Sequence, residues 1–268
     1  MHGSEHGKLV LSALSEERTA KYLAQTGNNA DRALSLYKWD SRLSAAMWSL
    51  ISLFEVVLRN KLCDAIDAWS DSVTPPSNKQ WIKEPKDNVR EPLSKVSASI
   101  ANSAKGKAAK AKELRDSGEG LIGGQHPRMG EPITRDDLIA QVTLTQWKEN
   151  FFYRSPETQP DGEVKFFPDE TRYNDLTRVY EAITEPALSA GPRPIDPDRA
   201  SFLMHRINLL RNRIGHQESL IDIDCGRLRK EIFELLNCLD PAVLEHYSSN
   251  DPIPGILRDD PRKRRASS

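Results

Sequence analysis

The sequence lacks the cysteine pattern that builds a disulfide framework or a zinc site. Its 268 residues contain three cysteines, at 63, 225 and 238, with no C-x-x-C spacing, whereas such sites need paired or closely spaced thiols. This usage is typical of a reducing compartment. The first residues also lack the basic and apolar regions of a signal peptide. We therefore expect a cytoplasmic protein with no disulfide, no metal and no other cofactor.

Long hydrophobic runs are absent as well. The most apolar stretch, 45–58, is interrupted by Ser49, Ser52 and Glu55 and falls short of the ~20 apolar residues that a membrane span needs. The formal charge of -1 gives no overall attraction to nucleic acid, so RNA would have to be bound by local basic patches. Motifs typical of phosphate-binding loops, dinucleotide-binding folds, serine hydrolases, zinc metalloproteases and calcium loops do not occur. We expect no membrane association, and none of these enzyme classes is indicated.

Apolar residues at helical spacing dominate what the sequence does contain. The spacing predicts helices over 15–25, 30–37, 40–68, 134–151, 173–189, 198–214 and 227–239, and the strongest stripe runs from Leu43 to Leu62. Asn29 or Asp31, Asp40 or Ser41, and Thr134 are good N-cap residues for three of these helices. No alternation is long enough to build a sheet. The fold class that the sequence predicts is all-α.

The composition shifts toward Pro, Ser, Lys, Ala and Gly over 71–131, which indicates a polar insertion. Within it, 93–115 is typical of a polar helix or a helical hairpin, and it carries Lys105, Lys107, Lys110 and Lys112. The simpler interpretation is a solvated helix face, and the functional one is a basic arm that contacts RNA phosphates. We predict one helical domain over 1–250 that includes this insertion, followed by a flexible basic tail over 251–268.

The densest group of polar side chains surrounds His216. Residues 210–218 are Leu-Arg-Asn-Arg-Ile-Gly-His-Gln-Glu. A five-residue step on a helix turns by about 500°, so Arg211 and His216 would point about 140° apart. Gly215 could unwind the last turn and bring His216 toward Arg211. The simpler alternative is that Arg211 and Arg213 compensate a helix C-terminus that His216 caps.

Three segments of the chain carry a recognisable pattern. The first comprises Leu-Tyr-Lys-Trp-Asp at 36–40, Leu-Ser-Ala-Ala at 43–46 and Phe-Glu-Val-Val-Leu-Arg-Asn at 54–60; the second is Leu-Ile-Ala-Gln-Val-Thr-Leu at 138–144 with Trp147; the third is 210–218. In this order they resemble the Abi-like family of bacterial abortive-infection proteins, which belongs to the HEPN superfamily.

The resemblance implies a HEPN-like helical bundle that cuts RNA without a metal, at a site where two protomers meet. It places Arg211, Asn212 and His216 in catalytic roles. The chain departs from the family's pattern at Gly215, where Ala is usual, and at Gln217, where a second His is usual. The implied function is that of a phage-defence effector or toxin, with a possible antitoxin partner. The alternatives are a non-catalytic HEPN-type module that binds RNA or protein, and a helical scaffold with no role in nucleic-acid binding.

This chemistry suits the residue types. A neutral imidazole can accept the proton of the RNA 2′-hydroxyl, and an imidazolium can protonate the 5′-oxygen that leaves. The Arg211 guanidinium can stabilise the charge that develops at phosphorus. The 2′-hydroxyl is the nucleophile, so RNA is cut and DNA is not. One His per chain is too few for both proton transfers, and we therefore expect a homodimer that brings two motifs to its axis.

Three residues of the first segment and one of the third are candidate supports for this site. Glu55 and Arg59 stand at i and i+4, as in a surface helix pair. In the alternative, Glu55 and Asn60 face the motif helix and orient Arg211 or His216. Arg213 is the support within the motif itself. Trp48, Trp69 and Trp147 are expected in the core or in an interface, with no role in RNA binding.

Overall fold

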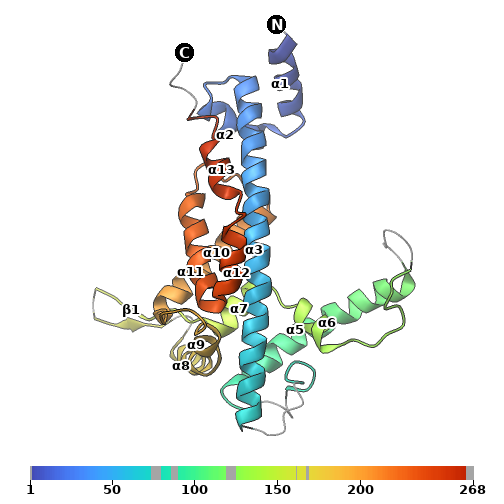
Figure 1. Ribbon diagram of the computed structural model, residues 1–268, viewed down its shortest axis with the longest axis vertical. Coiled ribbons are helices and arrows are strands. Elements are labelled where there is room, and N and C mark those ends of the chain that lie inside the picture. The colour runs from blue at the N-terminus through green and yellow to red at the C-terminus, as the bar shows by residue number, and fades with distance from the viewer. Residues whose placement is uncertain are drawn as a thin grey trace. The chain divides into compact units, whose positions relative to one another are not determined.

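The protein is mostly helical. The computed structural model describes residues 2–73, 80–85, 90–118, 125–160, 162–166 and 169–263, and 70% of the chain is helix against 2% strand, which confirms the all-α class. The elements follow in the order α1 His2–Ser12, α2 Glu16–Gln25, α3 Ala30–Val73, α5 Leu93–Ser117, α6 Arg135–Ala140, α7 Leu144–Phe151, β1 Glu157–Thr158, β2 Val164–Lys165, α8 Glu170–Val179, the π-helical segment η1 Tyr180–Thr184, α9 Glu185–Ala187, α10 Pro197–Gly215, α11 Cys225–Leu239, α12 Pro241–Ser248 and α13 Ile253–Arg258 (Figure 1).

The chain folds into two compact units, where the sequence predicts one domain over 1–250. The first unit comprises 1–54, 209–236 and 241–268, and the second comprises 55–208 and 237–240. Helices α3, α10 and α11 each contribute residues to both units. Neither unit is therefore a continuous stretch of sequence, which is why composition alone does not reveal the division.

Helix α3 is a single helix of 44 residues, where the sequence predicts two helices, over 30–37 and 40–68. Asp40 is a good N-cap residue, but here it lies inside the helix and is 3% exposed. The apolar stripe continues through this point, and Leu36, Leu43 and Met47 are buried in the first unit. Burial of each such side chain contributes about 1.5–3 kcal/mol, so packing favours one continuous helix over a capped break.

Among the described helices, α3 is also the one that is long and apolar enough to cross a membrane. Its most apolar 18-residue window has a mean hydropathy of 1.4, and 44% of that window is buried inside the protein. A helix at the centre of a folded core has the same composition. The expectation of no membrane association stays a prediction.

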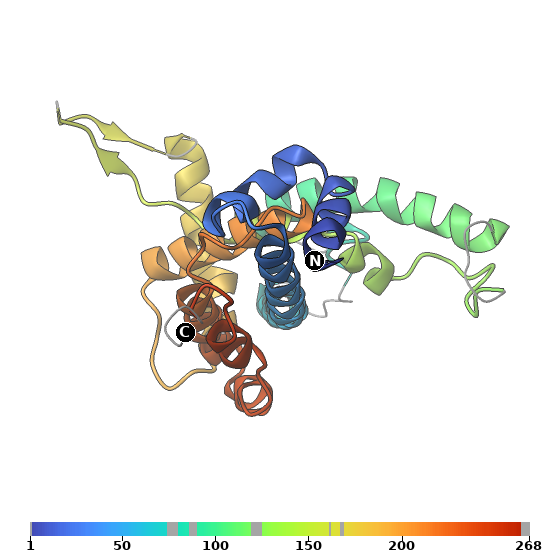
Figure 2. The ribbon, with the colours of Figure 1, turned by 90° about the horizontal axis from the view of Figure 1, so that it is seen from above.

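In the first unit, the C-terminal segment packs against the N-terminal half of α3. The indole Nε1 of Trp39 donates a hydrogen bond to the carbonyl oxygen of Ile256, at 2.7 Å, and Ile253 is fully buried. Seen from above, α1 and α2 lie on one side of α3, and α12 and α13 lie on the other (Figure 2). The prediction of a flexible tail is wrong for 251–263, because Ile253 and Ile256 anchor α13. Residues 264–268 lie outside the described part.

In the second unit, 93–115 of the predicted insertion forms one helix, α5, and not a hairpin. The face that carries Val96, Ile100 and Ala104 is buried, and α6 lies against α5 (Figure 1). The predicted helix over 134–151 is divided at 141–143 into α6 and α7, because Thr143 begins the second helix with a capping box, as Thr134 begins the first. Parts of the insertion, 74–79, 86–89 and 119–124, lie outside the described residues.

The remaining sequence predictions hold with small shifts of boundary. The helix predicted over 173–189 is formed by α8, η1 and α9 in succession, and those predicted over 198–214 and 227–239 are α10 and α11. The two-stranded ribbon of β1 and β2 pairs Glu157 with Lys165. Helix α10 therefore places the motif 210–218 at its C-terminal end, within the first unit.

Candidate functional site

The motif helix α10 ends in a tight hydrogen-bonded closure. The backbone N–H of Glu218 donates to the carbonyl oxygen of Arg213 and that of Gln217 donates to the carbonyl oxygen of Ile214, both at 2.9 Å, and Gln217 has a positive φ of 56°. This is the Schellman pattern, in which one left-handed residue ends the helix. The predicted break at Gly215 is wrong, because Gly215 remains helical and Gln217 supplies the left-handed turn.

His216 lies at this helix end and its side chain is exposed. It lines a pocket of about 520 Å³ that belongs entirely to the first unit. The other walls come from α2, the N-terminal half of α3 and the segment that follows α10. The pocket is lined by Glu17, Arg18, Lys21, Tyr22, Tyr37, Asp40, Ser41, Ser44, Arg213, Ile214, His216, Gln217, Glu218 and Ser219.

Asp40 fixes three chain segments around this pocket. Its Oδ2 accepts a hydrogen bond from the hydroxyl of Tyr22 at 2.6 Å, and its Oδ1 accepts one from the backbone N–H of Leu220 at 3.0 Å. Burial and this carboxylate hold the pKa of Tyr22 well above its usual range, so the phenol remains a donor. The ring of Tyr37 meets that of Tyr22 edge-on, with centroids 5.5 Å apart. The backbone on both sides of His216 is therefore anchored.

The cations around His216 are engaged with groups of the protein itself. The guanidinium of Arg18 donates to Oε1 of Gln217 at 3.1 Å, and Lys21 forms an ion pair with Asp222 at 3.2 Å. Arg213 donates through Nε to the carbonyl oxygen of Ser219 at 2.9 Å and lies 3.4 Å from Glu218. Arg213, predicted as a support, thus holds the segment after α10.

Arg211 does not line this pocket, although its Nη1 lies 3.9 Å from the Cβ position of Gly215, the residue before His216. Its guanidinium carbon is 5.5 Å from the centre of the Trp48 ring, as in a cation–π contact. The structure therefore does not bring the two principal motif residues into one pocket of a single chain. The reason is the unbroken helix, which keeps their directions about 140° apart.

Arg211 and Asn212 differ in the partners that their polar groups have. In the described part of the chain Arg211 forms no ion pair, and its Nε is buried with no hydrogen-bond partner. Asn212 accepts the backbone N–H of His216 at 2.9 Å through its carbonyl oxygen, and its side chain is half-buried. Arg211 is therefore the motif cation that remains available to a phosphate group.

The candidate supports from the first sequence segment belong to the second unit. Arg59 and Asn60 line a smaller pocket of about 230 Å³ together with Cys63 and Arg135, and Glu55 is half-buried. Burial raises the pKa of the Cys63 thiol to about 12. Nothing in the geometry of this unit tests whether Glu55, Arg59 and Asn60 orient the motif, and that role stays a prediction.

Of the four α5 lysines predicted to contact RNA, three are exposed and the fourth, Lys112, is half-buried. Lys105, Lys107 and Lys110 project from the polar face of the helix, whereas Lys112 forms an ion pair with Asp116 one turn along. The side chain of Lys112 is thus less available to a ligand than those of the other three. Their contact with RNA stays a prediction.

Two residues of the site were not recognised in the sequence. Asp40 lies in phase with the apolar stripe, between Leu36 and Leu43, and a carboxylate at such a position signals a buried hydrogen-bonded acceptor. Trp48 is expected in the core or an interface, but it is 39% exposed, and the guanidinium of Arg211 lies over its ring. No sequence signal distinguishes it from Trp147, which is fully buried.

The described residues contain no group of three His, Cys, Asp or Glu side chains placed to hold a metal ion. No protein-family model matches the chain, and neither a curated protein nor a solved structure matches it.

Proposed function

We propose that this protein is a HEPN-type endoribonuclease that cuts RNA without a metal, using His216 and Arg211. The observation that carries the proposal is the placement of His216, whose exposed imidazole lines a pocket with an anchored backbone. The second support is Arg211, a cation free of ion pairs in the described residues and five positions away on the same helix. These are the two residue types that attack by a 2′-hydroxyl needs.

The reaction follows from the chemistry of these groups. A neutral His216 imidazole accepts the proton of the 2′-hydroxyl as its oxygen forms a bond to phosphorus. The bond from phosphorus to the 5′-oxygen breaks, and an imidazolium returns a proton to that oxygen. The products are a 2′,3′-cyclic phosphate and a 5′-hydroxyl. Arg211 stabilises the charge on the phosphate oxygens in the transition state through charge-assisted hydrogen bonds.

A second copy of the chain completes this site in the proposal. The cations that line the His216 pocket are engaged within the protein, and Arg211 lies on Trp48 outside it. One chain therefore offers one imidazole and no free cation at the pocket. The exposed side chain of Trp48 (39%) offers apolar surface beside Arg211 for a twofold contact. Such a dimer supplies two imidazoles and two guanidiniums.

Trp48 is a positioning residue in this scheme, because it acts through Arg211. A partly exposed cation–π contact is worth about 0.5–1 kcal/mol, enough to hold the guanidinium in one direction. Trp48→Phe keeps an aromatic face and should retain cleavage, whereas Trp48→Ala should lower kcat by about three- to fivefold with little change in KM. Equal kcat values for wild type and Trp48→Ala would remove Trp48 from the mechanism.

The proposed activity is tested with purified protein and total RNA in excess EDTA. Wild type should cut, and His216→Ala and Arg211→Ala should not. His246→Ala is the matched control, since His246 is an exposed histidine on α12, and it should cut as wild type does. Cleavage that survives in His216→Ala would contradict the proposal. Absence of cleavage by a folded wild-type dimer would favour the alternative function, a non-catalytic module that binds RNA or protein.

Subunit mixing tests whether two imidazoles act together. Wild type and His216→Ala are mixed in equal amounts, unfolded and refolded together. If each site needs His216 from both protomers, about a quarter of the dimers remain active, whereas independent sites would leave about half of the total activity. The second result would place acid and base in one chain.

The biological setting belongs to the same proposal and rests on the resemblance of the three segments. We place the protein in the cytoplasm as an abortive-infection effector or toxin of phage defence, held in check by an antitoxin partner. Expression in bacteria should slow growth, and His216→Ala should relieve the effect. Equal growth with both chains would contradict a toxin.

A further inference from the structure

A second pocket of the first unit lies on the opposite face of α3 from the His216 pocket. Its volume is about 590 Å³, and its α3 residues, Ser35, Lys38 and Arg42, stand two positions away from Tyr37, Asp40 and Ser44 of the His216 pocket. Two positions on a helix correspond to about 200°. We call it the basic pocket, after four cations that line it, Arg32, Lys38, Arg42 and Arg262.

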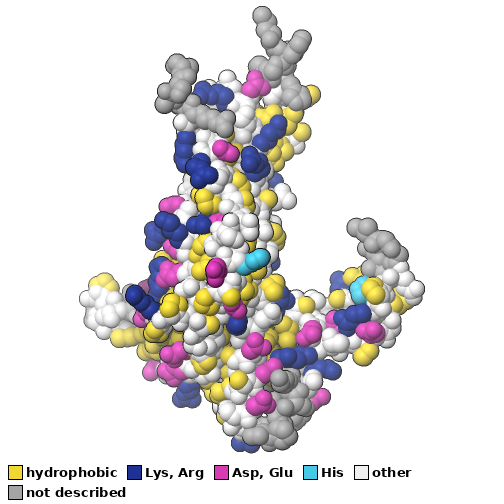
Figure 3. All heavy atoms as spheres, in the orientation of Figure 1, with side chains coloured by type: hydrophobic (Ala, Val, Ile, Leu, Met, Phe, Trp, Pro, Cys, Tyr) yellow, Lys and Arg dark blue, Asp and Glu magenta, His cyan; other side chains and the backbone are white. Residues whose placement is uncertain are grey.

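Three of these cations form no ion pair with a described residue, and Asp259 is the one carboxylate among the residues that line the pocket. The three are Arg32, Lys38 and Arg42, whose side chains are exposed. Arg262 differs, because it lies 2.7 Å from Asp260. Figure 3 shows Lys and Arg side chains gathered over the part of the first unit built from α2, α13 and the N-terminal end of α3. The pocket therefore carries excess positive charge.

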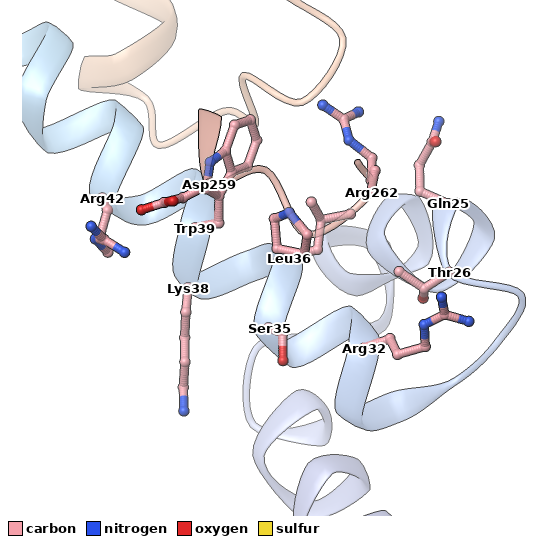
Figure 4. A pocket seen from close by; sticks show the side chains of 11 residues that line it. Gln25, Thr26, Arg32, Ser35, Leu36, Lys38, Trp39, Arg42, Asp259 and Arg262 are labelled. Carbon is pink, nitrogen blue, oxygen red and sulfur yellow. The ribbon is translucent and has the colours of Figure 1, made fainter. Parts of the chain in front are cut away.

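The spacing of the cations sets the size of the ligand. Arg32 and Arg42 are ten residues apart, about 15 Å along the helix axis. Figure 4 shows that the cationic side chains spread around the pocket, with Lys38 and Arg42 directed away from Arg32 and Arg262. One phosphate group is too small to contact all of them, whereas a chain of linked phosphates can.

The floor of the pocket offers no free aromatic face on which a base could stack. Leu36 is fully buried and Trp39 is 5% exposed, and the indole N–H of Trp39 is taken by the carbonyl oxygen of Ile256. The ring of Trp39 is covered by the guanidinium of Arg262, whose carbon lies 5.4 Å from the ring centre. No aromatic face is free for stacking, and Gln25, Thr26 and Ser35 are the uncharged polar residues that line the pocket, so we expect the cations to dominate recognition.

From this arrangement we propose that the basic pocket binds backbone phosphates of single-stranded RNA, without regard to base sequence. A flexible chain can enter a hollow that a flat bilayer surface cannot, which favours a polynucleotide over anionic lipid. The inference takes its ligand class from the proposed function, but it requires neither His216 nor cleavage. The site lies about one helix diameter, 10–12 Å, from the His216 pocket, within reach of one bound strand.

The test measures binding of a fluorescent 2′-O-methyl RNA oligonucleotide by anisotropy over a range of salt concentrations. This strand keeps the phosphates and lacks the nucleophilic hydroxyl, so binding is observed without cutting. Each neutralised phosphate contributes about 0.7 to the slope of log K against log salt for a single strand. The variant Arg32→Ala/Lys38→Ala/Arg42→Ala should therefore lose about 2 from that slope.

Two matched variants control for charge and folding. Lys83→Ala/Arg178→Ala/Arg193→Ala removes the same charge from exposed positions of the second unit and should keep the wild-type slope. Arg32→Lys/Lys38→Arg/Arg42→Lys keeps the charge of the pocket and should keep the slope as well. An unchanged slope in the alanine variant of the pocket, or an equal loss in the control variant of the second unit, would overturn the inference.

Separate readouts distinguish this inference from the proposed function. Wild type that binds the strand with the full slope but cuts no RNA would leave the basic pocket standing while the nuclease proposal fails. Wild type that cuts RNA, together with a pocket variant that keeps the full slope, would leave the nuclease proposal standing while the inference about the basic pocket fails. Vesicles of anionic phospholipid form the last arm. Binding to them in preference to RNA, lost in the pocket variant, would overturn the inference in favour of a membrane surface.

Discussion

Replacing Asp40 by alanine should be among the most costly single changes in the first unit. The carboxylate is 3% exposed and accepts hydrogen bonds from the Tyr22 hydroxyl and the Leu220 backbone N–H. Asp40→Ala leaves the Leu220 N–H buried without an acceptor and removes the charged acceptor of the Tyr22 hydroxyl, which keeps only Ser219 as a side-chain partner; each bond to a charged acceptor is worth about 1.5–3 kcal/mol. We expect a loss of about 3–5 kcal/mol, a large part of the ~5–15 kcal/mol that stabilises a typical domain.

Asp40→Asn is the matched control for this change. The asparagine amide has nearly the same shape, and its oxygen can accept the N–H of Leu220 while its NH₂ donates to the hydroxyl of Tyr22. Both buried groups keep a partner, so we expect a cost of about 1 kcal/mol or less. The difference between the two variants isolates hydrogen bonding from the loss of charge.

Urea denaturation followed by circular dichroism measures the effect, provided that the slope of the unfolding free energy against urea is unchanged. The midpoint should fall far more for Asp40→Ala than for Asp40→Asn. Because Leu220 follows the motif, Asp40→Ala should also lower RNA cleavage at temperatures where the protein is still folded. Equal stability losses for the two variants, or a loss below about 1 kcal/mol for alanine, would refute the role given to Asp40.

Other predictions follow from single positions. Gly215→Ala should raise stability by up to about 1 kcal/mol, because an added Cβ meets no atom closer than 3.9 Å and alanine favours the helix. Gly191→Ala should destabilise the protein by about 1–3 kcal/mol, since its Cβ would lie 2.8 Å from a carbonyl oxygen of α11. Thermal melts in which Gly191→Ala is the more stable of the two variants would contradict the packing described. Burial raises the pKa of Cys63 and Cys225 to about 12, so a disulfide reagent at pH 8 should label the folded protein far more slowly than the protein in guanidinium. Because these thiols ionise at lower pH in the unfolded chain, their contribution to the free energy of unfolding should be present below pH 9 and lost as the pH rises toward 12. Rapid labelling of the folded protein, or a free energy of unfolding that does not change over this alkaline range, would contradict the burial of the two thiols.

The sequence predicts the helices well where apolar residues recur without interruption. The stripe from Leu43 to Leu62 lies inside α3, and Thr134 caps α6 as its chemistry indicates. These features are local, since they depend on residues three to four positions apart. The all-α class follows from them directly.

The contacts between distant segments could not be predicted in this way. Asp40 resembles an N-cap when only its neighbours are known, and its role as a buried acceptor depends on Tyr22 and Leu220, 18 and 180 residues away. The folded position of α13 likewise depends on the hydrogen bond from Trp39 to Ile256, two residues that are 217 positions apart. Sequence patterning carries no information about such partners.

The sequence suggests which residues form the candidate site, but it does not predict how they are arranged. Gly215 is the obvious position for a left-handed turn, but a helix can end on another residue when the closing hydrogen bonds favour it, and here Gln217 takes that role. Because the helix is intact, the guanidinium of Arg211 lies over the ring of Trp48, and the side chain of His216 lines the pocket. The intact helix therefore adds a second reason for the homodimer that the sequence already predicts, because Arg211 does not line the His216 pocket of its own chain.

The most direct test of the central claim is cleavage of one defined RNA that carries a single 2′-deoxy residue at a mapped cut position. In excess EDTA, wild type should cut the unmodified strand there and leave a 2′,3′-cyclic phosphate, and it should leave the modified strand intact at that position. His216→Ala should cut neither. Cleavage beside the 2′-deoxy residue, or a product with a different end, would show that the 2′-hydroxyl is not the nucleophile and would contradict the account.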